Sequence, residues 1–205
     1  MNAFISYAAD IPESDSLRLY YDAIIFDIDE TLCPVMGPIL AGQAALFEYV
    51  DTYMPKSAAK IREETKSREI MSRLKEENPL MGHDFTDLRR CVLYSIAEEF
   101  DEQDRVEEAI QIFVKERSNI EPHLYTDSMA CIDWIRSQGV EVGLLTNGNC
   151  DVSYCVGLSS KLKFSLCAGD IGAQKPSPLP FIAAAQRAGT VVRIVSNIHV
   201  IHIIQ

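Results

Sequence analysis

The sequence predicts an α/β protein: a Rossmann-like parallel sheet core with helices on both faces, and an inserted all-helical segment. Short apolar runs rich in β-branched residues occur near the start of the chain and again after residue 139, where they alternate with helical patterns. Residues 39–120, which lie between these two regions, show helical periodicity and no β-rich run. Strands that alternate with helices are joined by right-handed crossovers, so we expect the strands to be parallel in one sheet.

The first expected strand ends in two aspartates. Ile24, Ile25 and Phe26 form a buried apolar run that leads into Asp27 and Asp29. Open α/β sheets bind ligands at the carboxyl ends of their strands, so both carboxylates are expected at that edge. Two carboxylates there are unfavourable unless they are paired, hydrogen-bonded or bound to a cation, and Mg²⁺ prefers such oxygen ligands. The alternative is a solvated strand end that leads into a turn.

The helical segment follows a turn-rich connection. One helix is expected around Ala44–Tyr49, and a charged run without glycine predicts another over 56–77, which Asn78-Pro79 terminates. Two more are expected over 85–100 and 104–115. The basic side chains of 56–75 alternate with glutamates, so a solvated helix face explains them better than a substrate clamp.

The alternation of strands and helices returns after Pro122. The elements expected there are a helix over 127–138, a strand over 140–145, a strand over 164–168, a helix over 179–188 and a strand over 191–195. Together with the first strand they predict a core made of residues 1–33 and 120–205. The helical segment between them, residues 34–119, is predicted to form a separate domain over this core.

Composition and charge exclude several classes of function. A net charge of −11 argues against general binding to nucleic acid or to an anionic membrane, and no apolar run approaches the roughly 18 residues of a membrane span. The six cysteines show no CxxC spacing, which favours reduced, mostly buried thiols. The N-terminus carries acidic residues and lacks the pattern of a signal peptide, so we expect a cytoplasmic protein.

The ends of later strands add polar groups to the edge where the aspartates are expected. Thr146 follows the strand over 140–145, and Lys175 lies in the loop after the strand over 164–168. Each has a structural explanation, because Thr-Asn-Gly is a common turn and a lysine before proline is usually solvated. Together with Asp27 and Asp29 they predict phosphoryl transfer.

Each residue receives a role in this hypothesis. Asp27 is the expected nucleophile that forms an aspartyl-phosphate, and Asp29 the acid that protonates the leaving alkoxide and then deprotonates water. The charge on the transferring phosphoryl group requires fixed donors. The Thr146 hydroxyl, the Lys175 ammonium and the backbone N–H groups at Asn147-Gly148 can supply them.

The same residues resemble the motifs of the haloacid dehalogenase-like (HAD) hydrolase superfamily. Residues 26–32 (FDIDETL) are similar to its first motif, 144–148 (LLTNG) to its second and 174–176 (QKP) to its third. The helical segment is similar to the α-helical cap that one subfamily carries between the first two motifs. In this family an aspartate at the position of Asp29 marks phosphatases, whereas true dehalogenases lack it.

This resemblance implies a function and a set of ligands. The expected activity is Mg²⁺-dependent hydrolysis of a small phosphorylated metabolite, with the cap opening and closing over the site. Asp27, Asp29, Thr146 and Lys175 would be catalytic, and Thr31, Asn147 and Gly148 would bind the substrate. Mg²⁺ would be held by the Asp27 side chain, the Asp29 backbone carbonyl and an aspartate of a fourth motif.

The end of the chain departs from the family pattern. Asn197 stands where the fourth-motif aspartate is expected, and an amide oxygen brings no charge to the metal. No acidic residue follows Asp170, and the last fifteen residues are mostly valine and isoleucine. We therefore expect a truncated or divergent C-terminal part, with a β-prone end able to self-associate. The alternative function is a catalytically inactive module that binds a partner or a phosphate ligand without turnover.

Overall fold

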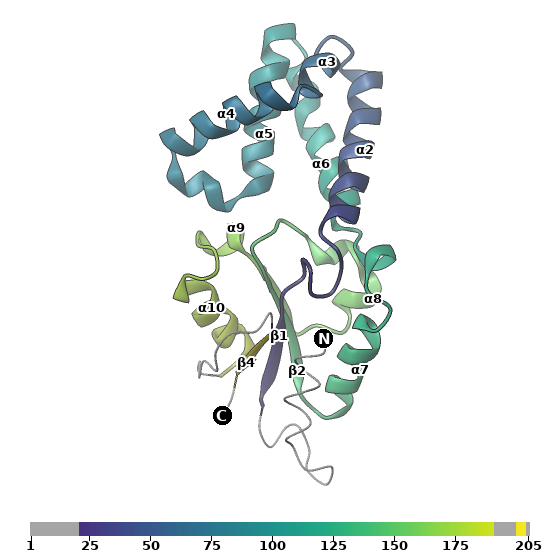
Figure 1. The fold of residues 1–205 in the computed structure, drawn as a ribbon, viewed down its shortest axis with the longest axis vertical. Coiled ribbons are helices and arrows are strands. Elements are labelled where there is room, and N and C mark those ends of the chain that lie inside the picture. Colours follow the sequence, from purple (N-terminus) through teal and green to yellow (C-terminus); the bar gives the residue numbers. More distant parts are fainter. Residues whose placement is uncertain (1–20, 191–199, 204–205) are drawn as a thin grey trace.

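A four-stranded sheet lies at the centre of the computed structural model, which describes residues 21–190 and 200–203. The strand order is β3-β2-β1-β4 (Figure 1). β1 (Ala23–Phe26), β2 (Glu141–Thr146) and β3 (Phe164–Cys167) are parallel. In the register, Phe26 pairs with Leu144, and Thr146 pairs with Cys167. The ends of these three strands therefore meet at one edge of the sheet, as the sequence predicted.

Helices cover both faces of the sheet because neighbouring residues of β1 point to opposite sides. Ile24 and Phe26 pack on one face with residues of α7 (Ser128–Ser137) and α8 (Val156–Ser159). Ile25 packs on the other face with the small side chains of α10 (Pro178–Ala188). All four β1 residues are buried. The predicted α/β core is confirmed.

The helical segment lies beyond the C-terminal edge of the parallel strands and has a hydrophobic core of its own (Figure 1). It contains α2 (Met36–Tyr53), α3 (Ala58–Ile61), α4 (Glu64–Glu77), α5 (Phe85–Ala97) and α6 (Val106–Ser118). We call these five helices, together with the segments that connect them, the cap. That the cap moves as a domain with the boundaries 34–119 stays a prediction.

Short elements complete the described chain. α9 (Ala168–Ile171) follows β3 directly. The single 3₁₀ turns are η2 (Pro79–His83), η3 (Glu98–Phe100), η4 (Gln103–Arg105), η5 (Glu121–His123) and η6 (Val152–Tyr154). No helix in the described ranges is long and apolar enough to cross a membrane.

The structure differs from the sequence-based expectation in two places. The helix expected over 56–77 is divided into α3 and α4, because the backbone becomes extended at Glu63. The second difference is that β4 (Val200–Ile203) pairs antiparallel with β1 at the edge of the sheet, so the sheet is mixed and not wholly parallel. The strand expected over 191–195 lies outside the described residues and stays a prediction. Self-association through this end of the chain stays a prediction.

α2 and α6 lie close together at a glycine of α2. A Cβ built on Gly42 would lie 2.9 Å from the Arg117 Cβ and 3.0 Å from the Phe113 carbonyl oxygen, both on α6. Such distances force the helices apart, because neither atom lies at the end of a flexible side chain. Gly42 therefore fixes the position of α6 relative to α2.

We expect Gly42→Ala to lower the free energy of unfolding. Overpacking costs about 1–3 kcal/mol, which exceeds the roughly 1 kcal/mol that alanine gains over glycine in a helix. Urea denaturation followed by circular dichroism measures the change. Gly82→Ala is the control, because a Cβ at Gly82 meets no atom within 4 Å. Equal stability of the two variants would contradict the assigned role of Gly42.

Candidate active site

The side chain of Asp27 follows β1 and is fixed by two donors. The backbone N–H of Ile28 donates to Asp27 Oδ1 at 2.8 Å, and Lys175 Nζ lies 2.9 Å from Asp27 Oδ2. The same ammonium donates to the Leu145 carbonyl oxygen at 2.8 Å. Lys175 thus joins the ends of β1 and β2, although 148 positions separate it from Asp27 in the sequence.

Asn147 fixes the loop that carries Lys175. The Lys175 backbone N–H donates to Asn147 Oδ1 at 2.7 Å, and Asn147 Nδ2 donates to the Lys175 carbonyl oxygen at 3.0 Å. This pair of hydrogen bonds uses both ends of the amide. The Asn147 side chain therefore positions the lysine. The substrate contact predicted for this residue would then be made by its backbone N–H.

Thr146 and Gly148 lie beside the two aspartates. Thr146 is buried at the end of β2, and its Oγ1 accepts a 2.9 Å hydrogen bond from the Gly148 N–H. A Cβ built on Gly148 would lie 2.8 Å from Asp29 Oδ2 and 3.2 Å from Thr146 Oγ1. Only glycine leaves this space open, so the second expected motif lies next to the first.

Asp29 has a partner that sequence analysis missed. Arg117 Nη2 lies 3.2 Å from Asp29 Oδ1, and the Arg117 side chain is only 2% exposed. Arg117 comes from the last turn of the cap helix α6, whose buried face also includes Val106, Ile110 and Phe113. A charged residue at i+4 from a buried phenylalanine is the signal that could have identified it, because a buried guanidinium requires an acceptor.

The pKa of Asp29 is raised above its usual value. Burial is the main cause because it favours the neutral carboxyl, while the Arg117 guanidinium lowers the pKa and the Asp27 carboxylate raises it. The two aspartates, two positions apart, thus occupy different environments. A carboxyl whose pKa is raised is better suited to donate a proton.

The other predicted site residues have different outcomes. Thr31 Oγ1 is buried and has no hydrogen-bond partner in the described part of the chain. The same is true of Arg117 Nη1. Asn197 lies outside the described residues. Within residues 21–190 and 200–203, no three His, Cys, Asp or Glu side chains lie close enough together to hold a metal ion.

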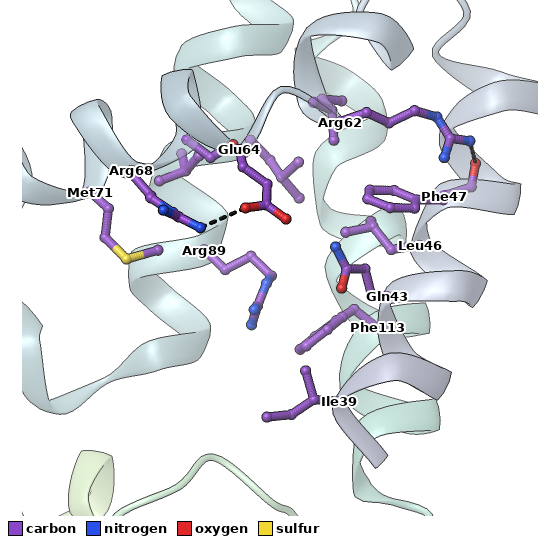
Figure 2. A pocket seen from close by; sticks show the side chains of 14 residues that line it. Ile39, Gln43, Leu46, Phe47, Arg62, Glu64, Arg68, Met71, Arg89 and Phe113 are labelled. Atoms are coloured by element: carbon purple, nitrogen blue, oxygen red, sulfur yellow. Dashed lines mark hydrogen bonds and ion pairs between the residues drawn. The ribbon is translucent and has the colours of Figure 1, made fainter. Parts of the chain in front are cut away.

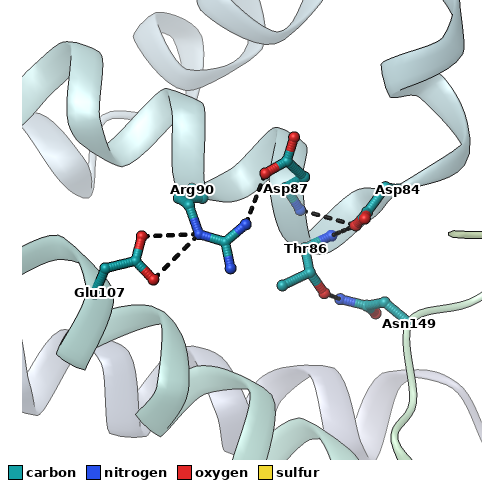
Figure 3. Close-up of polar contacts among 6 residues, drawn as sticks. All are labelled: Asp84, Thr86, Asp87, Arg90, Glu107 and Asn149. Carbon is teal, nitrogen blue, oxygen red and sulfur yellow. Dashed lines mark hydrogen bonds and ion pairs between the residues drawn. The ribbon is translucent and has the colours of Figure 1, made fainter.

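Two contacts join the cap to the core near this site. Asn149 directly follows the expected second motif, and its Nδ2 donates to Thr86 Oγ1 at 3.0 Å (Figure 3). Gln174 Nε2, next to Lys175, donates to the Gly82 carbonyl oxygen at 3.0 Å. A cavity of about 420 Å³ lies between these parts, with Asp84, Asp151 and Asp170 among its lining residues. The first contact joins the residue that follows the expected second motif to the cap, and the second contact joins a residue of the expected third motif to the cap.

Three of the six cysteines are buried and the other three are partly buried. All six are free. Cys33, close to the aspartates, is buried, and burial together with the Asp29 carboxylate raises its pKa to about 11. Burial raises the pKa of Cys150 to about 12. Such thiols carry little thiolate at neutral pH, so the arrangement offers no cysteine nucleophile among them.

Comparisons with known proteins agree with this arrangement. A family model for haloacid dehalogenase-like hydrolases matches residues 21–203. Among solved structures, a 2-haloacid dehalogenase from Pseudomonas syringae pv. tomato DC3000 is 30% identical to this chain, with a TM-score of 0.71. The match covers 81% of this chain and 72% of the dehalogenase chain. YfnB from Bacillus subtilis, solved bound to magnesium, is 18% identical with a TM-score of 0.50, covering 82% and 74%. Curated protein sequences gave no match.

The match covers nearly all of the described residues and includes the three motifs, the sheet that brings them together and the helical segment between the first two. The chain belongs to the haloacid dehalogenase-like hydrolases.

Proposed function

We propose that this hydrolase is a phosphomonoesterase that acts on a small phosphorylated metabolite through an aspartyl-phosphate. One observation carries the proposal: the ion pair of Asp27 with Lys175 at 2.9 Å lies beside a second carboxylate, Asp29, with its own cation. The first carboxylate is a nucleophile with a cation next to it for the phosphoryl charge. The second carboxylate, whose pKa burial raises, is the acid.

The proposed reaction has two steps, phosphoryl transfer to Asp27 and hydrolysis of the aspartyl-phosphate. An Asp27 oxygen attacks phosphorus, the bond from phosphorus to the leaving oxygen breaks, and Asp29 gives its proton to the departing alkoxide. The Asp29 carboxylate then takes a proton from water, whose oxygen attacks the same phosphorus. Inorganic phosphate leaves and Asp27 is regenerated. Lys175 and the Thr146 hydroxyl bind the phosphoryl oxygens in both steps, and the buried, unpartnered Thr31 hydroxyl is available as a further donor.

Mg²⁺ is the proposed cofactor, because the site residues offer the oxygen ligands that this ion prefers. Mg²⁺ takes oxygen ligands, often one or two carboxylates with water and phosphate completing the octahedron. The Asp27 carboxylate and the Asp29 backbone carbonyl would hold it, with Asn197 as a neutral third ligand. When bound, the ion neutralises charge on the transferring phosphoryl group.

Dehalogenation is the second candidate, because the Pseudomonas syringae structure that is 30% identical to this chain is a 2-haloacid dehalogenase. An aspartate nucleophile serves both reactions. A halide leaves without a proton, so a dehalogenase gains nothing from an acid beside the nucleophile, whereas an alkoxide requires one. Asp29 therefore favours the phosphatase. Halide release from 2-chloropropionate, compared with phosphate release from 4-nitrophenyl phosphate, separates the two activities.

Asp27→Asn should abolish phosphate release. An amide cannot form the acyl phosphate, and we expect a loss of at least about a thousandfold in kcat, with the residual rate set by binding and positioning alone. Release of nitrophenol from 4-nitrophenyl phosphate, with Mg²⁺ and again with EDTA, is the measurement. Asp133→Asn is the control, because Asp133 is exposed and paired with Lys161 on the core surface.

Two results would contradict the proposal. If the wild type is folded, as circular dichroism can show, and is as inactive as Asp27→Asn, the chain is a binding module without turnover. If EDTA leaves the rate unchanged, Mg²⁺ has no part in the reaction.

Arg117→Lys should slow phosphatase turnover by impairing Asp29. The shorter, differently shaped cation cannot reproduce the contact at 3.2 Å, so Asp29 is no longer aimed at the leaving oxygen. We expect kcat to fall about tenfold or more for an alkyl phosphate, and much less for 4-nitrophenyl phosphate, whose leaving group needs no acid. Equal losses with both substrates would show that Arg117 is only structural.

Asn197→Asp should lower the Mg²⁺ concentration that gives half-maximal activity. A carboxylate adds a charged oxygen ligand where the wild type offers a neutral one. A Mg²⁺ titration of initial rates on both proteins tests this. Identical titration curves would show that residue 197 does not face the metal.

A further inference from the structure

A cavity of about 300 Å³ lies entirely within the cap, between α2 and α6 on one side and α4 and α5 on the other (Figure 2). Its walls are mainly apolar and include Leu46, Phe47, Met71 and Phe113. Its volume is at the low end of the range of small-molecule sites. None of the proposed catalytic residues lines it.

The polar groups of this cavity carry an excess of positive charge. Three arginines line it, and Glu64 is the single acidic residue among its lining residues in the described chain. Arg62 is paired with Asp51, and Arg68 Nη2 lies 2.6 Å from Glu64 Oε2. Arg89 differs, because its guanidinium forms no ion pair or hydrogen bond within the described residues and stacks on the Phe113 ring, with its Cζ 3.8 Å from the centroid.

Arg89 lies on the side of the cavity next to the proposed active site. In Figure 2, Phe113 and Ile39 are at the lower end of the cavity, which faces the core, and the Arg89 side chain points toward that end. Phe113 precedes Arg117 by four residues on α6, a rise of about 6 Å. Arg117 in turn contacts Asp29. The Arg89 guanidinium thus stacks on the residue one helical turn before Arg117 on α6, and it is near enough to Arg117 for the two charges to interact.

The electrostatics of Arg89 suit the binding of an anion. Burial and, secondarily, the Arg117 charge lower the pKa of Arg89 to about 10. Both causes disfavour the charged form of Arg89. An anion bound next to the guanidinium would relieve this unfavourable free energy. Arg90, its neighbour in sequence, is instead paired with Asp87 and Glu107 (Figure 3).

We infer that this cavity binds the leaving group of the substrate, and that the leaving group is a ring-sized apolar body with one carboxylate, paired with Arg89. The inference rests on the proposed phosphatase function. The apolar walls match the body, and the planar guanidinium matches a carboxylate in a two-bond geometry. One uncompensated positive charge matches one negative charge, so a carboxylate fits better than a second phosphate dianion.

Binding of two non-hydrolysable phosphonates tests this inference. Benzylphosphonate and 4-(phosphonomethyl)benzoate differ only by the carboxylate. Isothermal titration calorimetry in buffer with Mg²⁺ gives both dissociation constants for the wild type, Arg89→Gln and Arg90→Gln. We expect the wild type and Arg90→Gln to bind the carboxylated probe about tenfold more tightly than benzylphosphonate. Arg89→Gln should lose this preference and bind benzylphosphonate as the wild type does.

Other outcomes overturn the inference. Equal binding of the two probes by the wild type, a preference that survives in Arg89→Gln, or binding of neither probe would each exclude Arg89 as the carboxylate site. A thermal melt of each variant shows that it is folded. Hydrolysis of 4-nitrophenyl phosphate is measured separately: turnover without a preference overturns the inference alone, and a preference without turnover overturns the proposed function alone.

Discussion

The ion pair of Asp29 with Arg117 is the interaction on which the arrangement of the site depends. Arg117 is fully buried, and a buried guanidinium without an anion would be strongly unfavourable. Its partner belongs to the turn after β1, whereas Arg117 itself belongs to the last turn of α6. The pair therefore fixes the cap helix α6 to the end of the first core strand. Gly42 maintains the same geometry from the other side, because its missing side chain lets α2 approach Arg117.

Charged side chains lie along the path from the core to the cap cavity. Lys175 is paired with Asp27, and Arg117 is paired with Asp29, so each of the two neighbouring carboxylates has a cation of its own. Beyond Arg117 lies Arg89, stacked on Phe113 and unpaired within the described residues. The surplus positive charge is thus in the cap, where we propose that the leaving group binds, while each carboxylate at the proposed catalytic site has its own cation.

Much of the core could be predicted because its signals are local. Apolar β-branched runs with polar ends identified β1, β2 and β3, and the rule that parallel strands end at one edge brought Asp27, Thr146 and Lys175 together. Breaks in regular structure were harder to predict. Residues 56–77 have the composition of one helix, and only packing of α3 and α4 in different directions explains the extended backbone at Glu63. The antiparallel pairing of β4 with β1 likewise had no local signal.

The sequence by itself determined the α/β class, the family resemblance and the two aspartates with their lysine, since each depends on residues close in the chain or on strand ends. Tertiary structure decided which cation serves which carboxylate. Helical periodicity places Arg117 on the buried face of α6, but not which anion, 88 positions away, it meets. The same holds for Arg89, which sequence does not distinguish from its paired neighbour Arg90. Charge pairing depends on distances of a few ångströms, and only the packing of the cap on the core sets them.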